Sequence, residues 1–316
     1  MISTITLNPS IDKTIYIPKL LPNDTNRVLS VEIDAGGKGI NCSRMLKRLG
    51  AETRVVALLG GKSGDYVASV LRKEDIDLEM IATGKPTRTC VCVEESTGLP
   101  PTTFNERGGP IEHKELVDFL ELAKNISRQS SYLVFGGSVP PGINNEVYRV
   151  LIDIASAGGA RSVLDADGDA LVEGLKARPF MIKPNRDEAE RLLGVEFKSK
   201  SDVARAALSL SERGIEVVVI SLGRQGAMAC QDGVIYHATP PEVKSVSTIG
   251  SGDSMIAGML FAFANGAGIE EALKMGCAAG AATAMSSGAD IGLKADVDEL
   301  LGQVKVGRIE PTPIAH

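Results

Sequence analysis

The sequence predicts an α/β fold with a central, mostly parallel sheet that is covered by helices on both faces and carries a small β-sheet beside it. The first observation is that short apolar runs, rich in β-branched residues, alternate with amphipathic stretches along most of the 316 residues. The second is that two stretches break this alternation. Because no internal repeat or low-complexity linker is visible, we expect a single domain over residues 1–316.

The predicted strands are short apolar runs separated by stretches with helical periodicity. The strands are expected at Ile2–Leu7, Arg54–Leu59, Tyr132–Phe135, Ser162–Leu164, Phe180–Ile182 and Val217–Ser221. The spacing i, i+3, i+4, i+7 occurs at Cys42, Met45, Leu46 and Leu49, and again at Ile256, Met259, Leu260 and Phe263. Strands that alternate with helices favour a parallel sheet, and ligands of such folds bind at the carboxyl ends of the strands.

The two stretches that break the alternation cover residues 13–33 and 87–107. Both read as strands and turns without helical periodicity. We expect them to form a small β-sheet that projects from the core as a lid or an interface.

Composition excludes several classes of protein. A net charge of −6 argues against a broad nucleic-acid-binding surface. The sequence contains no apolar run of about 18 residues, and its first residues lack a basic segment followed by an apolar one. We therefore expect neither a transmembrane helix nor a signal peptide, and place the protein in the cytoplasm.

The cysteines and histidines do not form a recognisable site. Cys90 and Cys92 make a C-x-C, but no second pair or nearby histidine completes a zinc site, so we expect structural thiols. His113 and His237 lie outside every glycine-rich or acidic motif, and His316 is terminal. A general base is therefore expected to be a carboxylate.

The motif that points most directly to chemistry is TIGSGDSMIAG, from Thr248 to Gly258. Gly250, Ser251 and Gly252 open an amphipathic helix, so their amide groups can converge on an anion. Asp253 falls in the first turn, where a carboxylate can take a proton from a hydroxyl that attacks a phosphoryl group. Taken alone, the stretch fits a glycine-rich helix cap equally well.

A second glycine-rich motif, DAGGKGIN, also runs into a helix and spans Asp34 to Asn41. Its glycines allow close approach of the backbone to a ligand, and Lys38 and Asn41 offer donors for hydroxyl or phosphate groups. An ordinary tight turn is the alternative.

A third motif, IKPNRDE, covers Ile182 to Glu188. Asn185 and Glu188 have the spacing of a capping box. The functional alternative places both near Mg²⁺ through water, with Lys183 near nucleotide phosphates.

Two familiar nucleotide-binding motifs are absent. Gly61-Lys62-Ser63 resembles the end of a P-loop, but the position that needs the first glycine is Val56. The third glycine of a dinucleotide fingerprint is also missing, which makes a dinucleotide-dependent oxidoreductase improbable.

Taken together, five ordered motifs resemble the PfkB carbohydrate-kinase family over nearly the whole chain. They are Gly36-Gly37-Lys38-Gly39-Ile40-Asn41, Gly137-Ser138-Val139-Pro140-Pro141-Gly142, Lys183-Pro184-Asn185 with Glu188, Ser221-Leu222-Gly223-Arg224-Gln225-Gly226 and Thr248-Ile249-Gly250-Ser251-Gly252-Asp253-Ser254. The opening TLNPSID, from Thr6 to Asp12, is similar to the branch acting on phosphorylated hexoses. That branch includes 1-phosphofructokinase, tagatose-6-phosphate kinase and the minor 6-phosphofructokinase.

The resemblance implies a ribokinase-like fold and a role for each motif. Asp253 would be the catalytic base, and Gly250, Ser251 and Gly252 the anion hole. The residues that would bind the sugar are Asp12, Gly37, Lys38, Gly39, Asn41 and Ser138. Those that would hold ATP are Lys183, Asn185, Ser221, Gly223, Gly226, Cys277 and Ala281.

The resemblance also implies metal ions and an assembly. Glu188, with Asn185, would organise Mg²⁺ through water. Some family members bind K⁺, here implied at Ser247, Ile249, Thr283, Ser286 and Gly288, although Asp290 stands where a related phosphofructokinase carries arginine. Family lids often pair, so we expect a homodimer through the β lid.

The expected reaction is ATP-dependent phosphorylation of a primary hydroxyl of a ketohexose phosphate, with O1 of fructose 6-phosphate as the leading candidate. Arg27 and Arg88 lie in the two lid stretches, and the planar fork of arginine suits a phosphate. Weakly paired surface arginines are the alternative reading. The alternative activities are those of a 1-phosphofructokinase, a tagatose-6-phosphate kinase, or a non-catalytic sugar-phosphate sensor.

Overall fold

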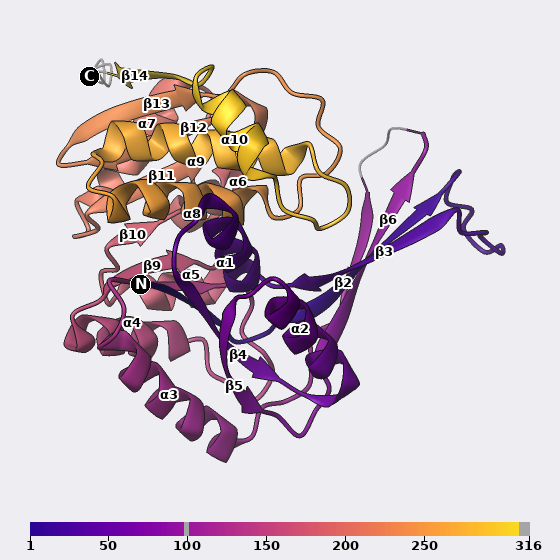
Figure 1. The fold of residues 1–316 in the computed structure, drawn as a ribbon. Helices are drawn as coiled ribbons and strands as arrows, with labels where there is room; N and C mark the ends of the chain where they lie inside the picture. The colour runs from indigo at the N-terminus through magenta and orange to yellow at the C-terminus, as the bar shows by residue number, and fades with distance from the viewer. Residues whose placement is uncertain (98–100, 310–316) are drawn as a thin grey trace.

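The computed structural model describes residues 1–97 and 101–309, and it contains a ten-stranded sheet, sheet A, and a four-stranded sheet, sheet B (Figure 1). The strand order of sheet A is β14-β13-β12-β11-β10-β9-β8-β1-β4-β5. Its strands are β1 Ile2–Thr6, β4 Thr53–Leu59, β5 Asp77–Ala82, β8 Tyr132–Gly136, β9 Arg161–Asp165, β10 Met181–Ile182, β11 Val217–Ser221, β12 Ala227–Gln231, β13 Val234–Thr239 and β14 Lys305–Ile309. The segment from β11 to β5 is parallel, whereas β11 to β14 pair antiparallel.

All six predicted strands are present in sheet A, and the predicted fold class is confirmed. β1 ends one residue earlier than expected, at Thr6, and β10 is reduced to Met181–Ile182. The strands β5, β12, β13 and β14 were not predicted; β5 forms one edge of the sheet, and β12 to β14 form the other.

Helices cover both faces of sheet A. The helices are α1 Lys38–Leu49, α2 Gly61–Lys73, α3 His113–Ser127, α4 Val147–Gly158, α5 Gly168–Leu175, α6 Arg186–Leu193, α7 Lys200–Ser211, α8 Ser251–Ala264, α9 Ile269–Ala284 and α10 Lys294–Leu301. One face packs on α3 to α7, and the other on α1, α8, α9 and α10.

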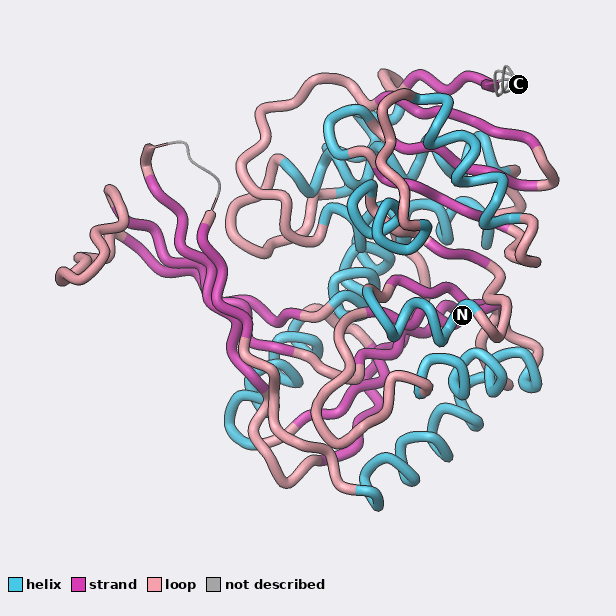
Figure 2. Tube along the Cα trace, turned by 180° about the vertical axis from the view of Figure 1, so that it is seen from behind, coloured by secondary structure: helices cyan, strands magenta, loops and turns pink. Residues whose placement is uncertain are grey.

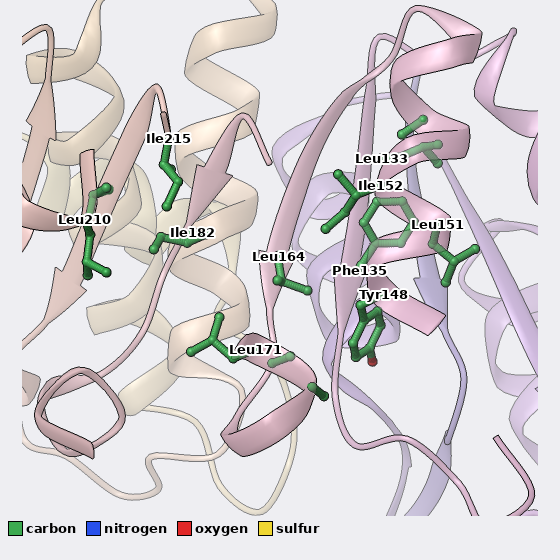
Figure 3. Packing of buried hydrophobic residues seen from close by; sticks show 14 of the residues in the cluster. Leu133, Phe135, Tyr148, Leu151, Ile152, Leu164, Leu171, Ile182, Leu210 and Ile215 are labelled. Atoms are coloured by element: carbon green, nitrogen blue, oxygen red, sulfur yellow. The ribbon is translucent and has the colours of Figure 1, made fainter. Parts of the chain in front are cut away.

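The cores on the two faces draw on alternate residues of the same strands, as the pleat requires. Ile5 and Leu7 pack with α3 and α4, whereas Ile2 packs with α1 and α8. Figure 3 shows the first core, in which Phe135 and Leu164 of neighbouring strands meet the buried side chains of α4 and α5. These two cores fix the carboxyl ends of the strands, where the site lies.

Sheet B is built from the two stretches that break the alternation, as predicted, and it projects from the body of the molecule (Figure 2). Its order is β3-β2-β6-β7, with β2 Ser10–Ile17, β3 Ser30–Gly36, β6 Arg88–Glu95 and β7 Thr102–Asn105. Part of the second stretch, residues 98–100, lies outside the described residues. The register aligns Asp12 with Asp34 and Cys90.

That register divides sheet B into two chemically different faces. The face directed to sheet A is polar and carries the side chains of Ser10, Asp12, Thr14, Tyr16, Glu32, Asp34, Arg88, Cys90, Cys92, Thr103 and Asn105. The opposite face is mainly apolar and leaves Val31, Ile33 and Phe104 exposed.

Within residues 1–97 and 101–309, no helix is both long and apolar enough to cross a membrane.

Candidate active site

A cavity of about 750 Å³ lies between the carboxyl ends of the sheet A strands and the polar face of sheet B. Its walls come from the loop after β1, the start of α1, the start of α5, strands β2, β6 and β7, and the turn that precedes α8. Open α/β sheets bind ligands at this end of the sheet. The cavity therefore lies where the fold predicts a binding site.

Asp253 lies on the wall of this cavity, in the first turn of α8, and its side chain is buried. Gly250 is the residue at the N-cap, so the amides of the first turn face the same region as the carboxylate. Asn41 of α1 donates from Nδ2 to Asp253 Oδ2 over 2.8 Å. The two glycine-rich motifs, more than 200 residues apart, thus meet at one carboxylate.

A second carboxylate, Asp165, lies at the end of β9 and is only 2% exposed. It forms ion pairs with Lys38 Nζ at 3.2 Å and with Lys183 Nζ at 3.5 Å. Lys183 also approaches the turn before Asp253, because a Cβ added to Gly252 would lie 3.1 Å from its Nζ. Two lysines therefore converge on the helix N-terminus with one buried acid between them.

These charges determine the pKa values at the site. Burial and the negative charge of Asp165 raise the pKa of Asp253 to about 6, against the opposing effect of Lys38 and the hydrogen bond from Asn41. Burial also acts to raise the pKa of Asp165, but Lys183 and Lys38 outweigh it and hold that pKa below its ordinary value. Asp165 is thus the ionised partner of the lysines, and Asp253 is poised near neutrality, as a general base requires.

Several buried polar atoms around Asp253 have no hydrogen-bond partner among the described residues. They include Asn41 Oδ1, Ser251 Oγ and Thr6 Oγ1. Buried polar groups are rarely left unpaired, so unpaired atoms beside a cavity indicate a polar ligand.

Asn185 and Glu188 form the capping box of α6 that their spacing predicts. The Asn185 side chain accepts from the Glu188 amide over 2.8 Å, and the Glu188 carboxylate accepts from the Asn185 amide over 2.8 Å. Glu188 is also buried and lines the cavity. The capping reading is therefore confirmed, and the location leaves room for a role at the site as well.

The expected sugar-binding residues fall into two groups. Those that line the cavity are Asp12, Gly37, Lys38, Asn41, Arg88 and Ser138. Arg88 is held by the carbonyl groups of Asn8 and Glu106, to which it donates over 3.2 and 2.8 Å. Gly39 is buried beneath Thr6, and Arg27 is exposed in the loop between β2 and β3, so neither is part of the cavity wall.

The residues expected to hold ATP are not among those that line the cavity. Ser221 ends β11, Gly223 opens a short 3₁₀ turn and Gly226 closes it. Cys277 and Ala281 are buried on α9.

The residues implied for K⁺ gather at the turn before α8 and the loop after α9. Ser247 Oγ accepts from the Ile249 amide over 3.2 Å. Thr283 Oγ1 donates to Ser254 Oγ over 2.7 Å. Ser286 and Gly288 lie in the following loop, where Asp290 pairs with Arg48 at 2.7 Å.

In the part of the chain that the structure describes, no three His, Cys, Asp or Glu side chains converge as a self-sufficient metal site. The cysteines of the C-x-C are free, and Cys90 and Cys92 line the cavity as thiols. A divalent ion would therefore need oxygen ligands from a bound phosphate and water, which is the usual coordination of Mg²⁺.

Sequence reasoning missed Asp165 and Asn8. Asn8 donates from Nδ2 to Ser138 Oγ and to the Arg107 carbonyl, both over 3.0 Å, and ties three wall segments together. Their positions in the sequence could have identified both, because each polar residue directly follows the carboxyl end of a predicted strand, where ligands of α/β folds bind.

Comparisons with known proteins identify the family of the chain. A model of the "pfkB family carbohydrate kinase" matches residues 5–296. The 1-phosphofructokinase of Bacillus subtilis (strain 168) is 32% identical over 309 residues, which are 98% of this chain and 100% of that protein.

Solved structures show the same relationship. Phosphofructokinase-2 from Escherichia coli in complex with fructose-6-phosphate aligns with a TM-score of 0.89 at 30% identity, covering 96% of this chain and 98% of that one. That enzyme has also been solved in complex with potassium and as a tetrameric inhibited form. Ribokinase from Arabidopsis thaliana aligns with a TM-score of 0.77 at 20% identity over 95% of this chain and 98% of that one, a likeness of fold alone. The ribokinase-like fold is thereby confirmed.

Proposed function

The chain belongs to the pfkB family of carbohydrate kinases, and we propose that it transfers the γ-phosphoryl group of ATP to a primary hydroxyl of a ketohexose phosphate. The observation that carries the proposal is Asp253 on the cavity wall, at a helix N-terminus and beside two lysines. Phosphoryl transfer needs alignment and charge neutralisation more than covalent chemistry, and this arrangement supplies both.

Asp253 is the proposed base. Its pKa of about 6 leaves it ionised at neutral pH, yet basic enough to accept the proton of a sugar hydroxyl. The bond from Asn41 engages Oδ2 and fixes the orientation of the carboxylate. Asp12, whose pKa burial raises, lies on the facing wall and would accept from another sugar hydroxyl.

The proposed phosphate-binding groups are the amides of Gly250, Ser251 and Gly252 together with Lys38 and Lys183. When bound, Mg²⁺ and these cations neutralise charge on the transferred phosphoryl oxygens. Glu188, on the cavity wall, and Asn185 would hold the ion through water. The residues proposed to surround ATP are Ser221, Gly223, Gly226, Cys277 and Ala281.

Arg88 is the proposed anchor for the phosphate already on the sugar. It lines the cavity, and two carbonyl groups fix its guanidinium, which suits a second phosphate site. We propose fructose 6-phosphate as the substrate and O1 as the acceptor. Fructose 1-phosphate is the second candidate, favoured by the name of the 32% identical Bacillus relative.

We also propose that the protein is a homodimer in which sheet B serves as lid and interface. The support is the exposed apolar face of sheet B, together with Val28 and Leu29 in the neighbouring loop. Arg27 precedes these residues in the same loop, and we propose that it contributes to the sugar phosphate site in the dimer. K⁺ at Ser247, Ile249, Thr283, Ser286 and Gly288 is a further proposal, supported by the potassium complex of the bacterial relative.

The decisive experiment is a coupled ADP-release assay on fructose 6-phosphate, fructose 1-phosphate and tagatose 6-phosphate. Asp253→Asn is expected to retain ATP binding and lose turnover, because removal of a general base costs roughly 10²–10⁴-fold in rate. A variant with near-normal kcat would show that the base is another group. A wild-type enzyme that preferred fructose 1-phosphate would change the substrate and leave the kinase assignment intact.

A further inference from the structure

The loop between α9 and α10, residues 285–293, contacts sheet B through Ser287 and Gly288 and the start of α8 through Ile291. We call it the α9–α10 loop. The proposed function gives the side chains of Ser287 and Asp290 no contact with ATP or sugar. The loop nevertheless forms hydrogen bonds or ion pairs with sheet B, α1 and α9.

On one side, the α9–α10 loop is held by the polar face of sheet B. Ser287 Oγ donates to Glu32 Oε1 over 3.1 Å, and the Gly288 amide donates to the Tyr16 hydroxyl over 3.1 Å. Tyr16 in turn donates to Glu32 Oε2 over 3.1 Å, which closes a ring of three hydrogen bonds. The Ala289 amide adds a bond to the Asp34 carboxylate.

The close approach at this point requires glycine. Gly288 has a φ of 57°, in the left-handed region, and a Cβ added there would lie 2.4 Å from the Glu32 carboxylate. The loop is therefore shaped to receive the carboxylate of β3, and the contact is specific rather than incidental.

On its other side, the α9–α10 loop contacts α1, the end of α9 and the start of α8. Asp290 pairs with Arg48 of α1. The Gly292 amide donates over 3.0 Å to Thr283 Oγ1, which donates to Ser254, the residue after Asp253. Ile291 packs against Gly250, since a Cβ added to that glycine would lie 3.0 Å from Ile291 Cδ1.

We infer that Tyr16, Glu32 and Ser287 are positioning residues for phosphoryl transfer. They act through the α9–α10 loop, so that the seating of sheet B on the loop aligns the first turn of α8 and its Asp253. The inference rests on the proposed role of Asp253. Displacements of about 1 Å in a catalytic constellation can cost on the order of 10²-fold in rate, so a loop that braces this helix turn controls kcat.

The test uses the full-length kinase and the sugar phosphate that the wild-type enzyme phosphorylates. Tyr16→Phe and Ser287→Ala should each lower kcat about tenfold while both KM values stay within about twofold, because substrate binding groups are untouched. Ser287→Thr retains the hydroxyl and should restore kcat. The double variant should lose less than the product of the single effects, since both hydrogen bonds end on Glu32.

Tyr66→Phe is the matched control. Tyr66 of α2 donates to the Ile33 carbonyl of the same strand, β3, over 2.8 Å, and among the described residues it has no hydrogen bond to the α9–α10 loop. It should leave kcat unchanged. An equal loss in Tyr66→Phe, or a raised sugar KM with normal kcat in Tyr16→Phe, would show that these contacts only attach sheet B and would overturn the inference.

Failure of the inference is separable from failure of the proposed function. If Asp253→Asn abolishes turnover while the Tyr16 and Ser287 variants turn over normally, the positioning role is wrong and the base stands. If Asp253→Asn turns over normally, the assignment of Asp253 as the base is wrong. The positioning role then also fails, because it depends on that assignment.

Discussion

Asp165 shows how a residue outside every recognised motif can set the chemistry of one inside. It holds Lys38 and Lys183 in place, and its charge is the main electrostatic reason, after burial, that the pKa of Asp253 is raised. A base with an ordinary aspartate pKa would be a weaker proton acceptor at neutral pH.

Asp165→Asn should therefore shift the pH profile in a defined direction. Removal of the negative charge leaves Lys38 and Lys183 as the neighbouring charges, so the pKa of Asp253 falls from about 6. Because the ionised form is the base, activity should persist to lower pH, and the acid limb of kcat/KM should move down by several tenths of a unit or more, about the effect of one nearby charge.

The measurement is kcat/KM between about pH 5 and 8, because the pH dependence of kcat/KM reports the pKa of the base in the free enzyme. The phosphate of the sugar also titrates in this range, but it does so identically with both enzymes, so the wild-type profile is the control. An unmoved acid limb would mean that Asp165 does not set the pKa of Asp253.

Glu188 has an observed role in the capping box of α6 and a proposed role at Mg²⁺, and measurements of stability and of metal dependence can separate the two. As part of the capping box, its loss should lower stability by about 1 kcal/mol. If Glu188 also orders Mg²⁺, Glu188→Gln should raise the Mg²⁺ concentration needed for half-maximal activity more than it raises the sugar KM. Titration of Mg²⁺ at fixed ATP measures this. An unchanged titration curve with a lowered melting temperature would show that Glu188 has only the capping role.

At the level of elements, α8 and α9 are packed through glycines. A Cβ added to Gly276 would lie 2.6 Å from Met259 Cγ and 2.8 Å from the Met255 carbonyl oxygen, and Gly258 is equally close to α9. The close packing fixes the axis of α8, and with it the position of Asp253 at its first turn.

Gly276→Ala should therefore destabilise the protein and lower kcat together. Overpacking of this kind costs about 1–3 kcal/mol, because a backbone oxygen cannot move aside as a side chain can. Differential scanning fluorimetry and the kinase assay measure the two effects.

Gly302→Ala is the control, since Gly302 has a φ of −65° and a Cβ there meets no described atom within 4 Å. That variant should melt at the wild-type temperature or slightly above it. Equal stability of Gly276→Ala and the control would show that the helices can separate without cost.

The elements of the parallel core were predictable because each strand is an uninterrupted apolar run followed by a helical pattern. Val217–Ser221 was predicted to the residue. The antiparallel strands β12, β13 and β14 were not predicted. β13 and β14 contain few buried residues and so lack an uninterrupted apolar run, and β14 joins the sheet only after three intervening helices.

The site was predictable where function imposes an unusual local sequence, as in Gly250 to Asp253. Asp165 has no such neighbours, and its role depends on two lysines brought together only by the fold. Arg27 illustrates the opposite case: its residue type suited a phosphate, but it lies in the exposed loop between β2 and β3, away from the cavity of its own chain.

At the scale of the whole molecule, sheet B presents an apolar surface that the rest of the chain leaves exposed. Leu29 is 64% exposed, Phe104 59% and Ile33 48%. The register places Phe104, Val91 and Ile33 in one row across the sheet, with Lys13 of β2 between Val91 and Ile33, so this face is mainly apolar. Exposed apolar faces of this kind mark protein–protein interfaces.

Phe104→Asp should therefore convert the proposed homodimer into monomers. Pairing of two such faces would bury the substituted carboxylate without a partner, and burial of an unpaired charge costs more than a hydrophobic contact returns. Light scattering coupled to size exclusion should give twice the 33.2 kDa chain mass for the wild type and the single mass for the variant. Thr103→Asp is the matched control, because the adjacent residue of β7 points to the opposite, cavity face; it should remain dimeric even if its sugar KM rises. A monomeric wild type, or a dimer that survives Phe104→Asp and is lost in Thr103→Asp, would place the subunit contact away from the apolar face of sheet B.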